Sequence, residues 1–235
     1  MSTKQIRVNE RTDGRTELTV NHNNQDLTFI YPSFGPNTYA NVQNEIEQAK
    51  LKTSTMSQTA SLVDSAFNSK DRYSQEIQKL LKEKWLWTFT GILYVPKEGA
   101  YIQDDPEVKK GMPFMEKSGL VKLLEANDPS VRFVPFGFKT GEMSSSKLAK
   151  NKFAIGLAGE EGAEKLAETA SKFKDQPYLY GFESVEEAVT RVSALYSGWY
   201  SDHGLDVYGD YYGYDRNCHA FGYAPQNFST GNKAE

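Results

Sequence analysis

Residues 86–95 read LWTFTGILYV, a run of apolar, aromatic and β-branched residues. Residues of these types are enriched in strands, and Pro96 directly after the run would end the strand. We therefore predict a buried central strand here. Residues 131–138, VRFVPFGF, form a second strongly β segment, in which Pro135 indicates an edge strand or a bulge.

Alternation of apolar and polar residues predicts a β-hairpin on the N-terminal side of this strand. Its arms are Arg15–Val20 and Asp26–Tyr31, joined by an Asn-rich turn at residues 22–24. Apolar residues at helical spacing predict the helices. These are expected to begin at Asn37 or Thr38, near Ser57 and at Ser118, and to cover residues 73–84, 159–174 and 184–195.

This balance of elements predicts the α+β class in a single domain of residues 1–235. Within that domain, residues 1–36 would form an N-terminal hairpin extension and residues 37–195 a scaffold with helices. Residues 196–224 would form a C-terminal region without helices, because helical signals stop after Leu195.

Composition argues against several classes of function. The chain has 27 Lys+Arg and 31 Asp+Glu, a net charge of −4, which disfavours a nucleic-acid partner bound through its phosphates. No apolar run approaches the ~20 residues that span a bilayer, so we expect no membrane insertion. Cys218 is the only cysteine, so neither an internal disulfide nor a Cys-based zinc site is expected. The polar start lacks the apolar core of a signal peptide, so we expect a soluble protein without one.

Residues 196–223, YSGWYSDHGLDVYGDYYGYDRNCHAFGY, differ in composition from the rest of the chain. They hold seven of the 14 tyrosines, five glycines and two of the three histidines. They contain no Lys, Glu, Gln or Met, whose flexible side chains lose more rotamer entropy when they are ordered.

Three interpretations of this segment compete. It could be a Gly/Tyr-rich tail of short strands and turns. It could be a metal or acid–base site, because His203, His219 and the nearby aspartates suit Mn, Fe or Zn, although no His-x-x-x-His spacing is present. It could also be a recognition surface, because Tyr supplies a large amphipathic contact area at low entropic cost while Ser, Gly, Asp and Asn adapt their hydrogen bonds.

The missing residue types also have a genetic interpretation. If the adenines of the Asn codons AAC and AAT are randomised, every residue becomes reachable except Lys, Glu, Gln, Met and Trp. Four of these five types are absent, and Trp199 would then belong to a fixed scaffold. The other expected anchors are Leu195, Leu205, Val207 and Phe221, with polar or aromatic residues between them.

The C-terminal sequence also contains Arg191-Val192-Ser193-Ala194-Leu195, then Trp199, Leu205, Val207, Gly209, Tyr214 and a closing Ala220-Phe221-Gly222. With this arrangement it resembles the variable proteins of diversity-generating retroelements, the archaeal group above all. In such systems an error-prone reverse transcriptase copies a template, with mutagenesis at adenines, into the 3′ end of a target gene. The resemblance implies a C-type lectin fold, in which residues 37–195 are the lectin-type scaffold and residues 196–224 the variable ligand-binding region.

Carried over residue by residue, the resemblance implies that the diversified positions lie between the scaffold residues and face solvent. These positions are Gly198, Tyr200, Asp202, His203, Asp206, Tyr208, Asp210, Tyr211, Tyr212, Asn217 and His219. The acidic members Asp202, Asp206 and Asp210 predict a negative patch that favours basic partners.

The function implied by the resemblance is non-covalent recognition of a protein or glycan ligand, in host attachment or cell–cell association. We expect no enzymatic activity and no cofactor, and exposure on a cell surface or a virion. Two alternatives stay open. One is a metal-dependent hydrolase that uses His203, His219 and nearby aspartates, and the other is a structural virion component.

Overall fold

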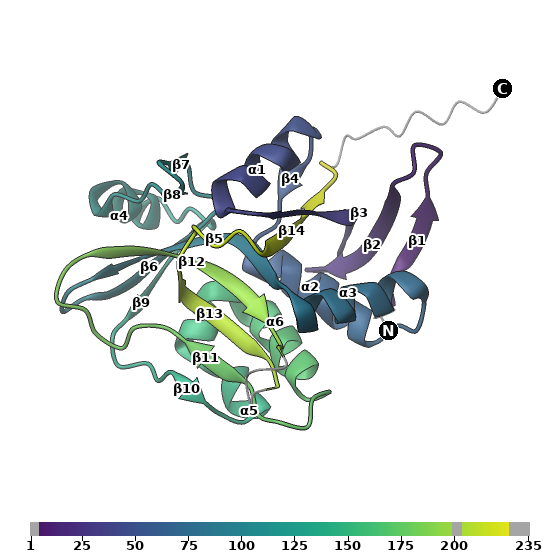
Figure 1. Cartoon of the computed structure of the whole chain (residues 1–235). Helices are drawn as coiled ribbons and strands as arrows, with labels where there is room; N and C mark the ends of the chain where they lie inside the picture. The colour runs from purple at the N-terminus through teal and green to yellow at the C-terminus, as the bar shows by residue number, and fades with distance from the viewer. Residues whose placement is uncertain (1–4, 199–203, 226–235) are drawn as a thin grey trace.

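The computed structural model describes residues 5–198 and 204–225, and this part of the chain is mixed α/β, in agreement with the expected α+β class (Figure 1). The helices are α1 (Tyr39–Gln48), α2 (Met56–Phe67), α3 (Arg72–Glu83), α4 (Lys117–Glu125), α5 (Ser145–Leu148) and α6 (Lys152–Ala170). The strands are β1 (Arg7–Glu10), β2 (Thr16–His22), β3 (Gln25–Asn37), β4 (Lys52–Thr53), β5 (Trp85–Val95), β6 (Gly99–Asp104), β7 (Val108–Lys109), β8 (Met112–Pro113), β9 (Val131–Pro135), β10 (Gly141–Glu142), β11 (Tyr178–Tyr180), β12 (Val189–Tyr196), β13 (Asp206–Tyr211) and β14 (Cys218–Tyr223).

Twelve of these strands form one sheet, in the order β1-β2-β3-β14-β5-β12-β13-β11-β10. Strand β4 pairs with β14 beside this path, while β6 pairs with β5 and β9 pairs with β6. Strand β5 lies in the middle, parallel to β14 and antiparallel to β12. Every residue of β5 except Trp85 is buried. The predicted central strand is therefore confirmed.

The predicted N-terminal hairpin is also confirmed, as β2 and β3. Their register pairs Thr16 with Tyr31 and His22 with Gln25. Strand β3 pairs on its other side with β14. Strand β14, the last described strand, lies between β3 of the hairpin and β5. The hairpin that was expected to be an extension is therefore continuous with the main sheet.

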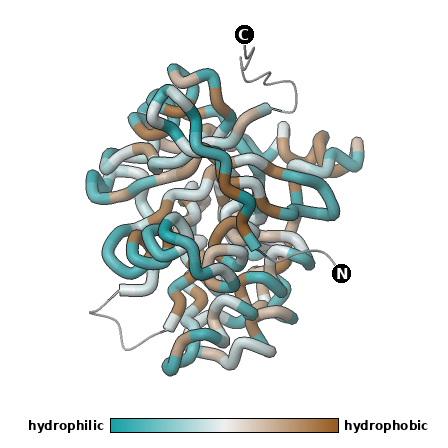
Figure 2. Tube along the Cα trace, turned by 90° about the vertical axis from the view of Figure 1, so that its right-hand side faces the viewer, coloured by the Kyte–Doolittle hydropathy of each residue, from teal (hydrophilic) through white to brown (hydrophobic). Residues whose placement is uncertain are grey.

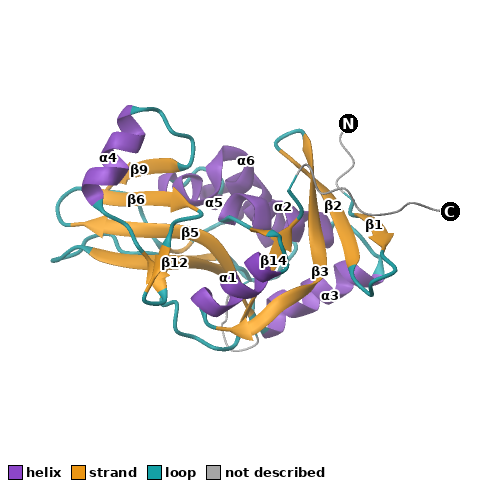
Figure 3. Cartoon of the chain, turned by 90° about the horizontal axis from the view of Figure 1, so that it is seen from above, coloured by secondary structure: helices purple, strands orange, loops and turns teal. Residues whose placement is uncertain are grey.

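Helices cover both faces of the sheet. Helices α2, α3 and α6 pack on one face, where Leu86, Ile92 and Phe221 belong to the larger core cluster. Helix α1 lies on the opposite face and packs against Trp87 and Phe89 (Figures 1 and 3). Apolar segments gather inside the molecule and hydrophilic residues dominate many outer turns (Figure 2).

Local signals explain where several helices begin. Helix α2 has a capping box, in which Thr55 and Gln58 satisfy each other's backbone N–H groups. The Asn151 side chain accepts from two backbone N–H groups at the start of α6. Helix α6 therefore begins before the predicted residue 159, and Gly159 instead kinks it with a φ of 73°.

The helix predicted over residues 184–195 is wrong, because this stretch contains strand β12 instead. Val189, Thr190 and Val192 are β-branched and therefore favour a strand intrinsically. Apolar spacing alone could not separate the two structures over so short a segment. Pairing with β5 on one side and β13 on the other decides the outcome.

Strand β9 contains the edge position indicated by Pro135. Among the described strands, β9 pairs only with β6, so the proline interrupts no second ladder. Within the described residues, no helix combines the length and the apolar character that crossing a membrane requires.

Candidate functional site

The Tyr-rich C-terminal segment contributes two interior strands to the sheet. Strand β13 runs between β12 and β11, and β14 runs between β3 and β5. The predicted anchors Leu195, Leu205, Val207 and Phe221 are all buried, as expected, while Trp199 lies outside the described residues. The described part of the segment is therefore built into the fold and is not an appended tail.

A β-bulge in β13 determines which tyrosines share a face. Ala194 of β12 is opposite Tyr208, and Val192 is opposite Tyr211, so three steps along β13 match two along β12. The extra residue reverses the alternation, because side chains on a regular strand change face at every step. Tyr208 and Tyr211 therefore point to the same side of the sheet.

The other side of β13 packs on helix α6. Val207 belongs to the core cluster beneath the helices. A Cβ atom at Gly209 would lie 2.5 Å from the Phe153 ring, which is closer than side chains pack. Gly209 is therefore required by close packing.

The face that carries Tyr208 and Tyr211 is lined with aromatic rings from four strands. We call it the aromatic face, and it consists of Trp85, Tyr178, Tyr180, Tyr196, Tyr208 and Tyr211. Trp85 stacks on Tyr196 with ring centroids 4.3 Å apart and on Tyr211 at 4.5 Å. Tyr208 stacks on Tyr180 at 4.2 Å with the rings 3° from parallel.

Because these rings stack on one another, many of their flat surfaces are already covered. A ligand would meet ring edges and hydroxyl groups instead. Burial is the main cause that raises the pKa of Tyr180, Tyr208 and Tyr211, so all three phenols are neutral near pH 7. The face therefore presents uncharged hydrogen-bonding groups on a rigid base.

Two of these hydroxyls already donate within the protein, and the Tyr208 hydroxyl donates to Asp206 Oδ2 at 3.5 Å. Tyr211 donates to Asp215 Oδ2 at 2.8 Å, and Asp215 Oδ1 accepts from the backbone N–H of Asn217 at 2.8 Å. The Tyr211 oxygen keeps its capacity to accept a hydrogen bond. At this end the face is therefore suited to ligand groups that donate.

The loop after β13 exposes two more tyrosines outside this face. Tyr212 is 56% exposed and lies under the Arg191 guanidinium, whose Cζ is 4.4 Å from the ring centroid. Tyr214 is 62% exposed and borders Gly111 in the turn between β7 and β8. Asn217 is also exposed.

The structure contradicts the expectation that all the proposed variable positions face solvent. Asp206 is 1% exposed and Tyr208 is 9% exposed, because β13 is an interior strand and Tyr208 is packed among other rings. Asp210 is partly buried, and this burial raises its pKa. The predicted negative patch is therefore wrong for Asp206, and Asp202 lies outside the described residues.

The other proposed positions are dispersed. His219 is a residue of β14, and its Nδ1 lies 3.2 Å from the Ser33 hydroxyl oxygen. Burial lowers the pKa of His219. Gly198 is buried, and a Cβ atom there would overlap the Tyr196 ring. Tyr200 and His203 lie outside the described residues. Only part of the predicted set thus comes together on one face.

Sequence reasoning missed the aromatic residues that other strands contribute to this face. Tyr178 and Tyr180 alternate around Leu179, a spacing that places two rings on one face of a strand. That signal was readable from the sequence. Trp85 was not recognisable in the same way, because the β5–β14 and β5–β12 pairings bring it to the C-terminal tyrosines.

Among residues 5–198 and 204–225, no three His, Cys, Asp or Glu side chains are grouped so that they could hold a metal ion. The hydrolase alternative needs His203, which is outside these ranges, and it stays a prediction. No protein-family model, no curated protein and no solved structure matches this chain.

Proposed function

We propose that this protein recognises a ligand non-covalently through the aromatic face and the loop that follows β13. The ligand is a protein or a glycan, and no catalysis is involved. The observation that carries the proposal is the assembly of six Trp and Tyr side chains from four strands on one side of the sheet. Aromatic residues with polar tips are enriched where proteins bind one another.

The aromatic face has the rigidity that recognition favours. Its rings stack on one another, so binding would order few additional side chains and would cost little conformational entropy. Two χ angles per tyrosine keep that cost low, and each hydroxyl adds hydrogen-bonding capacity. The partly exposed rings Trp85, Tyr180, Tyr196 and Tyr211 would meet the ligand first.

The finer proposal is a C-type lectin type of scaffold whose C-terminal region is diversified by a retroelement. The burial of the segment supports a division of labour within it. Leu205, Val207 and Gly209 pack inward and would stay constant. Tyr212 and Asn217 are exposed, so substitution there would cost no more than about 1 kcal/mol.

DNA sequencing of the gene's 3′ end and the few kilobases around it tests the diversification directly. We expect a near-repeat of codons 190–224 whose mismatches fall at adenines, close to a reverse-transcriptase gene. The mismatches should include codons 212 and 217. A flanking region without such a repeat would overturn the retroelement proposal and leave only the recognition surface.

A displayed library tests whether the scaffold tolerates the proposed variation. Codons with the first two bases randomised and a pyrimidine third would replace Tyr212 and Asn217 in one library, and Asp206 and Tyr208 in a matched second library. Sorting for protease resistance should retain most members of the first library and few of the second. Equal survival would contradict the assigned scaffold and variable positions.

A further inference from the structure

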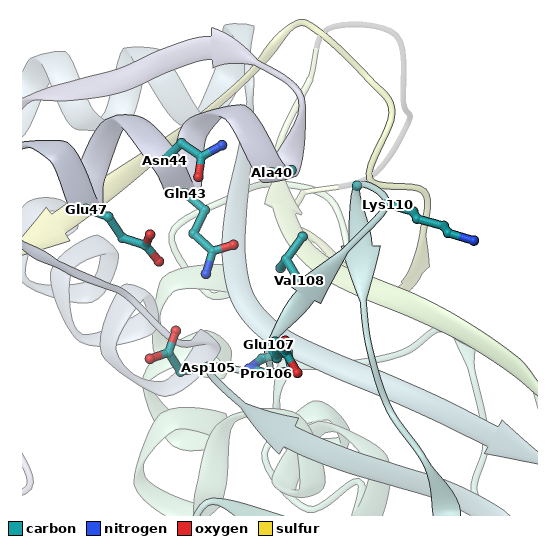
Figure 4. A pocket seen from close by; sticks show the side chains of 10 residues that line it. Ala40, Gln43, Asn44, Glu47, Asp105, Pro106, Glu107, Val108 and Lys110 are labelled. Atoms are coloured by element: carbon teal, nitrogen blue, oxygen red, sulfur yellow. The ribbon is translucent and has the colours of Figure 1, made fainter.

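A cleft on the α1 side of the sheet is separate from the aromatic face. Its volume is about 500 Å³, within the range of small-ligand sites. One wall is helix α1, and the other is the connection from β6 through β7 to the turn before β8 (Figure 4). The lining residues with polar or charged side chains are Gln43, Asn44, Glu47, Asp105, Glu107 and Lys110.

The lining is mainly polar and rich in acceptors. Glu47 and Asp105 come from opposite walls and point toward each other, while Lys110 points away from the cleft (Figure 4). Among the described residues, the Glu47 carboxylate has no ion-pair partner. The Asp105 carboxylate accepts from the Thr53 hydroxyl at 2.5 Å and keeps further acceptor capacity.

The amide side chains of Gln43 and Asn44 extend this wall. Both lie on α1 and line the same cleft as Glu47. Each carboxamide oxygen can accept a hydrogen bond, so two carboxylates and two amides surround one space. Lys109 pairs with Glu107 at 3.0 Å and neutralises that carboxylate, which leaves the Glu47 and Asp105 side as the negative part.

A second observation comes from Tyr39. Its hydroxyl is fully buried and has no hydrogen-bond partner among the described residues. Tyr39, Gln43 and Glu47 are four residues apart in turn, so they follow one stripe of α1. The Tyr39 ring packs against Trp87 and Phe89 beneath α1 and does not itself line the cleft. Burial raises the pKa of Tyr39, and the charges of Asp105 and Asp104 raise it further.

A buried hydroxyl without a hydrogen-bond partner costs free energy. We therefore expect another group to form a hydrogen bond with the Tyr39 hydroxyl in the functional state. A ligand N–H that reaches past Asp105 could donate to the Tyr39 oxygen, and a water molecule held by the ligand could accept from its O–H. The cleft thus combines two amides and two carboxylates without an ion-pair partner among the described residues, and the unpartnered Tyr39 hydroxyl lies in the core beneath α1.

We infer that this cleft binds an arginine side chain of a basic protein partner. The planar guanidinium carries five N–H donors, and carboxylate and amide oxygens on two walls can accept them together. The cleft is larger than one side chain requires, so neighbouring backbone of the partner can enter as well. This inference does not rest on the proposed function of the aromatic face.

The rim supports a peptide over a small free cation. Tyr214 is exposed and borders Gly111, which lines the cleft. The Tyr39 backbone N–H donates to the Gly213 carbonyl at 3.0 Å, so the start of α1 is tied to the loop that carries Tyr214. A residue next to the bound arginine would therefore meet an exposed aromatic ring.

The test uses the full chain and acetyl-Arg-Arg-Arg-amide as the probe, followed by two-dimensional NMR of the ¹⁵N-labelled protein. We expect saturable shifts in the backbone amides of residues 40–47 and 105–111. The citrulline analogue of the probe keeps the shape and removes the charge, and it should cause no shifts. Shifts confined to β13 and β14 would overturn the cleft assignment and would leave the proposed function of the aromatic face standing.

Variants separate the cleft from general attraction between charges. E47Q and D105N should each weaken binding of the arginine probe by about fivefold to tenfold. Asn tolerates the positive φ of Asp105, so D105N should fold normally. E125Q removes the same charge from exposed Glu125 on α4 and should leave the affinity unchanged. An equal loss in E125Q, or no loss in either cleft variant, would overturn the inference.

Discussion

Replacing Tyr208 with alanine tests whether the rings of the aromatic face are packed as in a protein core or lie loosely on the surface. Tyr208 is 9% exposed. Its ring contacts Tyr180 at 4.2 Å, Trp85 at 4.6 Å and Tyr211 at 5.3 Å between centroids. Removal of the ring would open a cavity among three other rings, which cannot collapse without breaking their own stacking.

The expected cost follows from these contacts. Truncation of a buried aromatic residue to alanine costs about 3–5 kcal/mol. We place Tyr208→Ala near the lower limit, at about 3 kcal/mol, because the residue keeps 9% of its surface exposed. In a chain of 235 residues, each kcal/mol shifts Tm by about 2–4 °C, so Tm should fall by about 6–12 °C.

Urea unfolding followed by tryptophan fluorescence and far-UV circular dichroism measures this loss. Tyr212→Ala is the matched control, because that tyrosine is 56% exposed and its main contact is the Arg191 guanidinium. The control should lose no more than about 1 kcal/mol. If both variants lost about the same free energy with unchanged m-values, Tyr208 would not be part of the packed face and the reasoning would be refuted.

Three further predictions concern the interior. Burial lowers the pKa of His22, so the unfolded chain binds more protons near pH 6, and stability should fall as pH drops below about 6.5. Urea unfolding at pH 7.5 and 5.5 should show a smaller loss for His22→Gln than for the parent protein, and an equal loss would contradict this role. In thermal melts, Gly209→Ala should cost about 1–3 kcal/mol, because the new Cβ would press on the Phe153 ring. Its control is Gly119→Ala, which has open space around it and should be neutral or stabilising by up to about 1 kcal/mol. Ser193→Ala should cost about 1–3 kcal/mol by the same measurement, because the buried hydroxyl donates across the bulge in β5; a loss below about 0.5 kcal/mol would show that the bond contributes nothing.

The strongly patterned elements of this fold could be predicted locally. Residues 86–95 consist mainly of apolar, aromatic and β-branched residues, which favour a buried strand in almost any context. Strand β5 is that strand. The alternation in residues 15–31 likewise indicates a hairpin, and β2 and β3 form it. Residues 184–195 were predicted wrongly, because their apolar spacing suits a helix while their β-branched residues suit a strand.

For the candidate site, the sequence identified the segment but not the face. The absence of Lys, Glu, Gln and Met and the abundance of tyrosine in residues 196–223 pointed to the right part of the chain. Composition alone could not predict that Asp206 is buried while Tyr212 is exposed. Both are polar residues between apolar anchors, and only the partners of β13 distinguish them.

By itself, the sequence determined the apolar anchors, the hairpin and the position of the central strand, because each depends on the periodicity of neighbouring residues. Only the tertiary structure decided that Tyr208 and Tyr211 share a side, since one extra residue in a bulge reverses the alternation. The tertiary structure also brought Trp85 to Tyr196 and Tyr211. Pairing between strands distant in the chain sets such contacts, and no local pattern encodes that pairing.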